Sequence, residues 1–193
     1  MHASSQIYSV PVESVDTPFL LLDREKFENN VDRLQKRIDA FGVVLRPHLK
    51  TVKSIEAARY LLRDKCAPAT VSTLREAEEF AQAGYRNLLY AVGIVPQKLP
   101  RVLSLIKQGV DIAVILDSAN QALAVNAASE QHQLSIPALI EIDCDGNRGG
   151  MLPNDPQLLV VGKILDQGHA EMRGVMAHAG GSYAASTPKA LVQ

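Results

Sequence analysis

The sequence predicts an α/β fold of the incomplete (β/α)8 barrel type. Short apolar segments rich in β-branched residues alternate with helical segments along most of the chain, and this alternation is typical of parallel strands covered by helices. The strand-like segments begin near residues 43, 69, 88, 111, 137 and 174, which gives about six barrel strands. Unusual polar residues follow the carboxyl ends of these segments, where barrel enzymes carry their active sites.

A polar leader and one long helix precede the predicted barrel strands. Phe19–Leu22 is an apolar run after the leader. Apolar residues at helical spacing then predict a helix with one apolar face, formed by Phe27, Val31, Leu34, Ile38 and Phe41. Gly42 is expected to end this helix, and Val43–Leu45 predicts the first barrel strand.

The rest of the chain continues the alternation. Further strands are predicted over the segments 69–72, 88–92, 112–116, 138–143 and 174–178. Capping residues mark the expected helix starts, which are Thr73 with Glu76, Ser118 with Gln121, Asp155 with Pro156, and Thr187 with Pro188. Glycines mark the expected helix ends, at Gly84, Gly109 and Gly168.

A doubly wound sheet fits the same alternation of strands and helices. Its dinucleotide-binding form needs glycines at the first strand–helix junction. The junction after Leu45 instead reads Arg-Pro-His-Leu-Lys-Thr. The sequence therefore favours the barrel.

Composition excludes several classes of protein. Lys plus Arg (20) and Asp plus Glu (21) nearly balance, so there is no electrostatic case for binding nucleic acid or an anionic membrane surface. No stretch is long and apolar enough to cross a bilayer, and the first residues do not resemble a secretory signal. Cys66 and Cys144 lie far apart and form no metal-type pair, which indicates a reducing, cytoplasmic compartment.

Lys50 is the first candidate for chemistry. It follows an apolar strand by a few residues, so its amine is expected at the catalytic end of that strand. Desolvation favours the neutral amine of a lysine, which can then condense with an aldehyde such as pyridoxal phosphate. By position alone, a surface-paired or helix-capping lysine is the better interpretation. His48 would point the same way on an extended strand, although it also fits an ordinary polar residue at a strand end.

Three further candidates lie in loops after later strands. Arg148 sits in a glycine-rich stretch, where glycines allow close approach of the backbone to a ligand and a guanidinium offers a rigid fork of donors. His178 follows the last strand, and its flat ring beside small residues could stack on a planar cofactor. Tyr183 could donate a hydrogen bond to that cofactor. Each is weak evidence alone, because a solvated loop residue explains it about as well.

The remaining acidic residues and glycines do not form the motif of a hydrolase, a metal site or a phosphate loop. Glu141 and Asp143 alternate on one strand and share a face, so Glu141 needs a partner if that face lies inside the barrel. No second pair completes a two-carboxylate hydrolase, and no metal-ligand spacing is present in the sequence. The pair Gly149-Gly150 lacks the Lys-Ser/Thr of a phosphate loop.

Taken together, these motifs resemble those of D-threonine aldolases and D-serine dehydratases. The similar stretches are Thr17-Pro18 with the following leucine run and Asp23, Leu45–Thr51, Glu141–Arg148 and Met176–Tyr183. The Pro-His-Leu-Lys-Thr motif is fairly specific, and its combination with the later motifs in the same order strengthens the resemblance. The resemblance implies the fold of the alanine racemase N-terminal domain, a (β/α)8 barrel that binds pyridoxal 5'-phosphate.

The resemblance also implies a role for each candidate residue. Lys50 matches the lysine that binds the cofactor covalently. Arg148 matches an arginine near the phenolic oxygen of the cofactor, and His178 matches a histidine that stacks near the pyridine ring. Tyr183 matches a tyrosine that lines the cofactor and substrate pocket. His48 is expected to have a supporting role.

The implied activity is that of a lyase acting on β-hydroxy-D-amino acids, by aldol cleavage or by dehydration. The family also uses a divalent metal as a Lewis acid, held by a histidine and a cysteine or aspartate two residues later, and no such pair is present in this sequence. The resemblance suggests a homodimer. The alternatives are an amino-acid racemase of the same fold, a non-catalytic pyridoxal-phosphate-binding homeostasis protein, and a structural fragment without a cofactor.

The number of residues and of predicted strands indicates an incomplete barrel. Residues 1–42 are expected to hold the leader, the first strand of a second β-rich domain and the first helix, and residues 43–193 a partial barrel. A complete barrel has about 250 residues, so the chain is expected to be the N-terminal part of a longer enzyme. Such a part should leave strands unpaired and an apolar inner face exposed, and should be inactive or poorly soluble alone.

Overall fold

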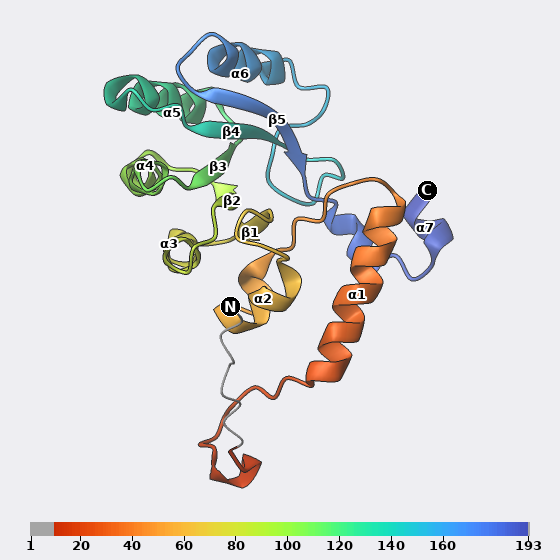
Figure 1. Ribbon diagram of the computed structural model, residues 1–193. Helices are drawn as coiled ribbons and strands as arrows, with labels where there is room; N and C mark the ends of the chain where they lie inside the picture. The colour runs from red at the N-terminus through yellow and green to blue at the C-terminus, as the bar shows by residue number, and fades with distance from the viewer. Residues whose placement is uncertain (1–9, 193) are drawn as a thin grey trace. The chain divides into compact units, whose positions relative to one another are not determined.

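A computed structural model describes residues 10–192, which divide into two compact units at the junction between Val43 and Val44. The second unit contains a five-stranded sheet (Figure 1). Its strands are β1 (Ala69–Val71), β2 (Asn87–Gly93), β3 (Asp111–Leu116), β4 (Pro137–Ile142) and β5 (Glu171–Ala177). All neighbouring strands are parallel, and their order in the sheet is their order along the chain.

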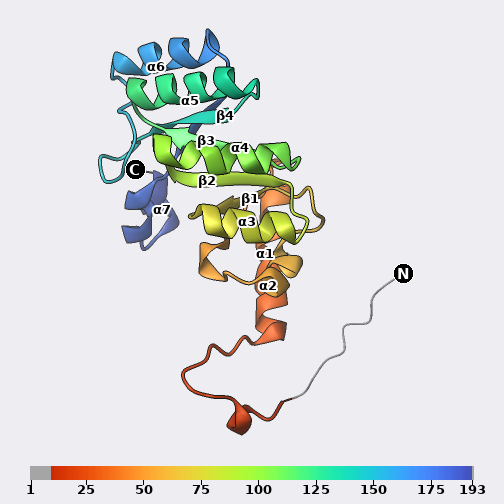
Figure 2. The same cartoon turned by 90° about the vertical axis from the view of Figure 1, so that its left-hand side faces the viewer.

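Helices connect these strands and cover one face of the sheet. The helices of this unit are α2 (Ile55–Leu61), α3 (Leu74–Gln82), α4 (Leu99–Lys107), α5 (Ala119–His132), α6 (Gln157–Asp166) and α7 (Pro188–Val192). Figure 2 shows α3, α4, α5 and α6 side by side along that face. A doubly wound sheet would reverse its strand order and carry helices on both faces. The structure therefore confirms the predicted α/β fold as a partial (β/α)8 barrel.

The core divides into a large and a small apolar cluster on the two faces of the sheet. In β3, Ile112, Val114 and Leu116 belong to the large cluster beneath the helices. The alternate residues Ala113 and Ile115 belong to the small cluster on the inner face. This alternation follows from the period of two along a strand.

The structure corrects two expectations about the strands. The predicted strand at 43–45 is wrong, because Val43 (55% exposed) and Val44 (79% exposed) form no ladder. Pairing with β1 is limited to a bridge between His48 and Thr70, where the Thr70 N–H donates to the Pro47 carbonyl oxygen at 2.9 Å. Pro47 has no N–H with which to extend a ladder. The sheet therefore has five strands among the described residues, where about six were predicted.

The second correction concerns the inner face. At its centre, Leu89, Ala113 and Ile115 are buried, so the expectation of an exposed apolar inner face is wrong there. Exposed apolar residues lie instead on β5, where Val175 is 59% exposed. Within residues 10–192, β5 pairs with β4 alone.

The predicted helix starts and ends are largely confirmed. Thr73 and Glu76 form a complete capping box at the start of α3, and the Ala190 N–H donates to the Thr187 hydroxyl at the start of α7. Positive φ values are found at the predicted helix-ending glycines Gly42, Gly84 and Gly109. The helix predicted to start at Pro156 begins one residue later, with the Gln157 N–H donating to the Asp155 carboxylate at 2.8 Å.

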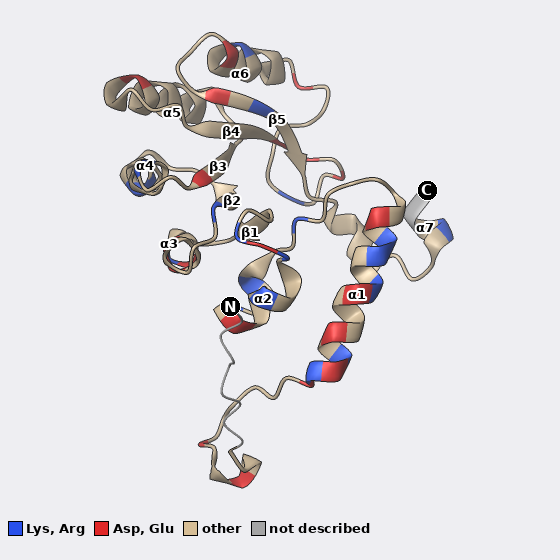
Figure 3. Cartoon of the chain, in the orientation of Figure 1, with Lys and Arg blue, Asp and Glu red and all other residues tan. Residues whose placement is uncertain are grey.

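The first unit contains a 3-10 turn, η1 (Val12–Ser14), and the helix α1 (Arg24–Ala40). Asp23 caps α1 by accepting a hydrogen bond from the Lys26 N–H at 3.0 Å. Basic and acidic residues are both spread along α1 (Figure 3), and no residue of α1 is buried. The run Phe19–Leu22 forms no strand among the described residues, so its assignment to a second domain stays a prediction.

No helix among residues 10–192 is long and apolar enough to cross a membrane.

Candidate active site

Lys50 lies on a tight turn at the carboxyl end of the segment that precedes β1. This turn is the 3-10 helix η2 (Leu49–Thr51). Leu49 is fully buried and anchors the turn in the core, whereas Lys50 is exposed. The turn is closed by the Lys53 N–H, which donates to the Leu49 carbonyl oxygen at 2.8 Å. The lysine amine is therefore carried on a short, packed turn, although the strand predicted before it does not form.

His48 connects this turn to the sheet. Its backbone bridges to Thr70 of β1, and its Nδ1 accepts a hydrogen bond from the Lys50 N–H at 3.3 Å. Burial of the ring, followed by the nearby Lys50 charge, lowers the pKa of His48 below its ordinary value. The imidazole is consequently neutral near pH 7, as a hydrogen-bond acceptor must be.

Arg148 emerges from a loop that folds back on β4. The Met151 N–H donates to the Glu141 carbonyl oxygen and the Asp143 N–H donates to the Met151 carbonyl oxygen, each at 2.9 Å. Gly150 makes this return close, since a Cβ there would lie 2.7 Å from the Asp143 nitrogen. The Arg148 side chain reaches Gly180 of the loop after β5, where an added Cβ would meet the Arg148 Cδ at 2.9 Å.

His178 and Tyr183 lie together in the loop after β5. The Tyr183 hydroxyl is 3.0 Å from Nε2 of His178. Their rings pack edge to face, with centroids 5.7 Å apart and planes at 72°. Tyr183 belongs to the 3-10 helix η4 (Gly180–Ala184), which begins two residues after His178. The Tyr183 side chain is 78% exposed in this structure.

Asp145 joins these two loops, and sequence reasoning missed it. Its Oδ2 accepts a hydrogen bond from the Gly181 N–H at 2.5 Å. This backbone donor is the main reason why the pKa of Asp145 lies below its ordinary value, with smaller contributions from His178 and Arg148. The partner in the other loop could not be identified from the sequence. The position of Asp145 within a glycine-rich stretch after a strand was the available signal.

Glu141 faces the same end of the sheet as a partly buried carboxyl group. Burial, followed by the nearby charge of Asp117, raises the pKa of Glu141, and the positive charge of Arg148 opposes this. The sequence predicts that Glu141 needs a partner if its face of the strand lies inside the barrel. Arg148 supplies a favourable charge, although no hydrogen bond joins the two side chains among the described residues.

The predicted site residues thus form two groups at the carboxyl ends of the strands. His48 and Lys50 are joined through their turn, and Arg148, His178 and Tyr183 are gathered by the contact between the loops after β4 and β5. Within residues 10–192, no three His, Cys, Asp or Glu side chains are grouped as metal ligands would be.

Comparison with known proteins gives a consistent result. The sequence profile described as "Alanine racemase, N-terminal domain" matches residues 22–191. D-threo-3-hydroxyaspartate dehydratase of Delftia sp. (strain HT23) is 42% identical over 179 residues, which are 92% of this chain and 47% of the dehydratase. D-threonine aldolase of Arthrobacter sp is 30% identical over 171 residues, covering 88% of this chain and 45% of the aldolase. The chain spans about half the length of the curated relatives it matches.

Solved structures agree with the sequence comparison. An alanine racemase-like protein from Idiomarina loihiensis superimposes with a TM-score of 0.88 at 48% identity, over 92% of this chain and 47% of that protein. An alanine racemase of Clostridium difficile 630 gives a TM-score of 0.64 at 18% identity, over 81% of this chain and 40% of the racemase. The latter likeness shows a shared fold alone.

Proposed function

Because this chain belongs to the alanine racemase N-terminal domain family, we propose that it is the cofactor-binding part of a pyridoxal-phosphate-dependent lyase acting on β-hydroxy-D-amino acids. The proposed substrate class is taken from the names of the relatives. They are a D-threo-3-hydroxyaspartate dehydratase, a 3-hydroxy-D-aspartate aldolase, D-serine dehydratases and a D-threonine aldolase. All four of these substrates are D-amino acids with a hydroxyl on the β-carbon.

The residues at the strand ends fit the cofactor chemically. Lys50 offers a primary amine for the aldehyde. Arg148 offers guanidinium donors for an oxygen of the cofactor, and its close contact with Gly180 leaves no room for a larger residue there. His178 offers a flat ring, which its hydrogen bond to Tyr183 keeps in one orientation. His48 supports the Lys50 turn through its ring, whose Nδ1 accepts a hydrogen bond from the Lys50 N–H.

Pyridoxal phosphate, when bound, supplies an electron sink for the α-carbon of an amino acid. In the proposed reaction the chain's own groups bind, orient and move protons. The Lys50 amine is the candidate base for the proton on the substrate α-carbon, since a primary amine near the reacting carbon can accept it. We include in this proposal a divalent metal, which would polarise the β-hydroxyl. Residues 10–192 supply no cluster of ligands for it.

The location and the assembly belong to the same proposal. The free, exposed thiols of Cys66 and Cys144 support a reducing, cytoplasmic compartment. The family resemblance of the site motifs supports a homodimer for the complete enzyme. A racemase of this fold is less well supported, because the racemase similarity is 18% against 42% for the dehydratase.

A spectroscopic titration tests the proposed function. Pyridoxal phosphate is added to the purified chain, and a visible absorption band is expected that is lost in Lys50→Ala and kept in Lys107→Ala, a control lysine in the last turn of α4. Borohydride reduction followed by peptide mass spectrometry should then locate the added mass on Lys50. A band of equal strength in Lys50→Ala, or mass on another lysine, would contradict the proposal. D-serine should change the spectrum more than L-serine does.

A further inference from the structure

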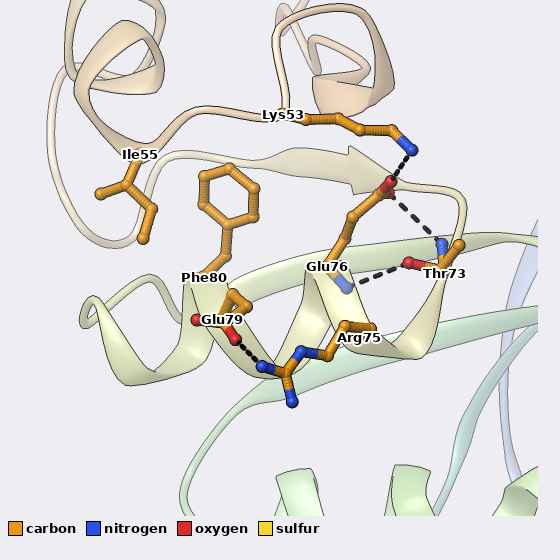
Figure 4. Close-up of a pocket in the computed structure, with 7 residues that line it drawn as sticks. All are labelled: Lys53, Ile55, Thr73, Arg75, Glu76, Glu79 and Phe80. Carbon is orange, nitrogen blue, oxygen red and sulfur yellow. Dashed lines mark hydrogen bonds and ion pairs between the residues drawn. The ribbon is translucent and has the colours of Figure 1, made fainter.

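A buried acidic residue outside the candidate site lies behind the Lys50 turn. A hollow of about 430 Å³ lies at the amino-terminal ends of α2 and α3, and Figure 4 shows the side chains that line it. Its lining residues are Lys53, Ile55, Thr73, Arg75, Glu76, Glu79 and Phe80. Glu76 is the most enclosed of the ionised side chains here, at 10% exposure. A carboxylate so enclosed requires compensation for its lost hydration.

One oxygen of Glu76 fixes the loop after β1. Oε2 accepts hydrogen bonds from the Ser72 N–H at 2.8 Å and from the Thr73 N–H at 3.3 Å. The Thr73 hydroxyl in turn accepts from the Glu76 N–H at 3.0 Å. The two bonds with Thr73 form the capping box of α3, and together with the Ser72 donor they explain the position of Oε2.

The other oxygen of Glu76 is not explained by helix capping. Oε1 is buried and has no hydrogen bond of good geometry among the described residues. The Lys53 ammonium lies 3.2 Å from it. Burial alone would raise the pKa of Glu76, but the Ser72 donor and the Lys53 charge together hold that pKa below its ordinary value. The carboxylate is therefore ionised and paired across the hollow with Lys53.

Lys53 is an unusual residue at its position. Its φ of 42° is in the left-handed region, which non-glycine residues rarely adopt and which persists where surrounding contacts enforce it. Its own N–H closes the turn that carries Lys50, through the bond to the Leu49 carbonyl oxygen. The backbone of Lys53 thus ends the η2 turn, and its side chain is held by Glu76.

From this arrangement we infer that Lys53 and Glu76 are positioning residues for Lys50. Their ion pair anchors the end of the η2 turn to the start of α3 and so fixes the direction of the Lys50 amine. The inference rests on the proposed function and deepens it, because it assigns the part of the fold that presents the reactive amine. Neither residue is required to touch the cofactor.

The hollow also contains a matched control. Arg75 and Glu79 form an ion pair of 2.5 Å on the exposed surface of α3, seen beside the Lys53 pair in Figure 4. This pair joins two residues of one helix and does not reach the η2 turn. Its loss should remove a similar surface charge contact and leave Lys50 in place.

The test compares Lys53→Met, Lys53→Arg, Glu76→Gln and Arg75→Met in the full chain. The first measurement needs no cofactor: the rate at which an amine-selective acylating reagent modifies Lys50, followed by peptide mass spectrometry. The second is the dissociation constant of pyridoxal phosphate, with the absorption maximum of the bound form. Lys53→Met and Glu76→Gln should weaken cofactor binding about tenfold, since small displacements of a reacting group have large effects. Both should also change the Lys50 modification rate and shift the absorption maximum.

The controls separate positioning from stability. Lys53→Arg keeps the charge, so its Lys50 modification rate and cofactor affinity should stay within about twofold of the wild type. Arg75→Met, which leaves the Lys53–Glu76 pair intact, should do the same. The Lys53 side chain is 62% exposed, but its replacement leaves the enclosed Glu76 carboxylate without its charge partner. A fall of a few degrees in the thermal midpoint is therefore expected, and both Lys50 readouts are compared at a temperature where every variant is folded. Lys50 reactivity and cofactor affinity in Lys53→Met and Glu76→Gln equal to those of Arg75→Met would overturn the inference. If the wild type lacks a Lys50-dependent band, the proposed function fails, and the modification rates still decide the positioning role.

Discussion

The Asp145 carboxylate accepts a hydrogen bond from the Gly181 N–H at 2.5 Å, across 36 residues of sequence. This bond joins the loop that carries Arg148 to the loop that carries His178 and Tyr183. Two parts of the candidate site are therefore held together by a residue that is not itself a candidate for chemistry. Loss of this bond should therefore make the loop after β5 more mobile.

Replacement of Asp145 by alanine should loosen the loop after β5. The Gly181 amide loses its charged acceptor, and hydrogen bonds to charged groups are stronger than neutral ones. Amide exchange at Gly181, followed by NMR, should become several-fold faster, and the affinity for pyridoxal phosphate should fall. Asp155→Ala is the matched control, because that carboxylate caps α6 through the Gln157 N–H. An unchanged Gly181 exchange rate in Asp145→Ala would count against the joining role.

Tyr183→Phe should separate site function from stability. The side chain is 78% exposed, so the free energy of unfolding should change by less than about 0.5 kcal/mol. Loss of the hydroxyl removes the contact with His178 Nε2 and frees the imidazole to rotate. The expected result is weaker cofactor binding with an unchanged thermal midpoint, measured by titration and by calorimetry. A large fall in the midpoint would show instead that Tyr183 is structural.

Gly150→Ala should destabilise the chain more than Gly109→Ala does. Both glycines have positive φ, 118° and 78°, so each substitution has a backbone cost of about 1–2 kcal/mol. At Gly150 the new Cβ would also lie 2.7 Å from the Asp143 nitrogen, whereas nothing lies within 4 Å at Gly109. Urea unfolding of the two variants should show the difference. Equal losses would mean that the Arg148 loop relaxes without cost.

Glu76 should contribute a pH-dependent part of the stability. Its folded-state pKa is below the ordinary value of 4.5, so the folded state favours the ionised form. This contribution is fully present above the unfolded pKa and is lost as the pH falls through the folded pKa. Urea unfolding should show that Glu76→Gln loses about 1 kcal/mol at pH 7.

The difference from the wild type should then shrink as the pH falls below about 4.5. Glu79→Gln, which removes a more exposed carboxylate of the same helix, is the control and should have the smaller effect at pH 7. A difference between Glu76→Gln and the wild type that is constant from neutral to acid pH would contradict this account.

The repeated strand–helix units could be predicted because their signals are local. Capping boxes such as Thr73 with Glu76, and glycines such as Gly84, act within one turn of helix. Their predictions hold to within a residue or two. The strand predicted over Val43–Leu45 is wrong because strand formation, unlike helix capping, depends on a distant segment. Its apolar, β-branched composition is typical of a strand, but a strand also needs a partner along its length, and composition does not specify one.

The candidate site shows the same limit. The candidates Lys50, Arg148, His178 and Tyr183 could be proposed from their places after predicted strands and from family motifs. The contacts that hold them could not, because each joins distant segments. The capping box predicted the contact of one Glu76 oxygen with Thr73. The partner of the other oxygen is Lys53, which lies in the segment before β1 and could not be predicted from local spacing. Asp145 and Gly181 are likewise paired by the folded loops and by no sequence spacing.

The order of the sheet has a consequence for how this protein is made. Each strand from β2 to β5 pairs with the strand synthesised just before it. As these five strands emerge from the ribosome, each one after β1 can therefore pair with a strand that has already been released. Assembly can follow translation from β1 toward β5, with the Lys50 turn among the first parts to be released and the Tyr183 loop among the last.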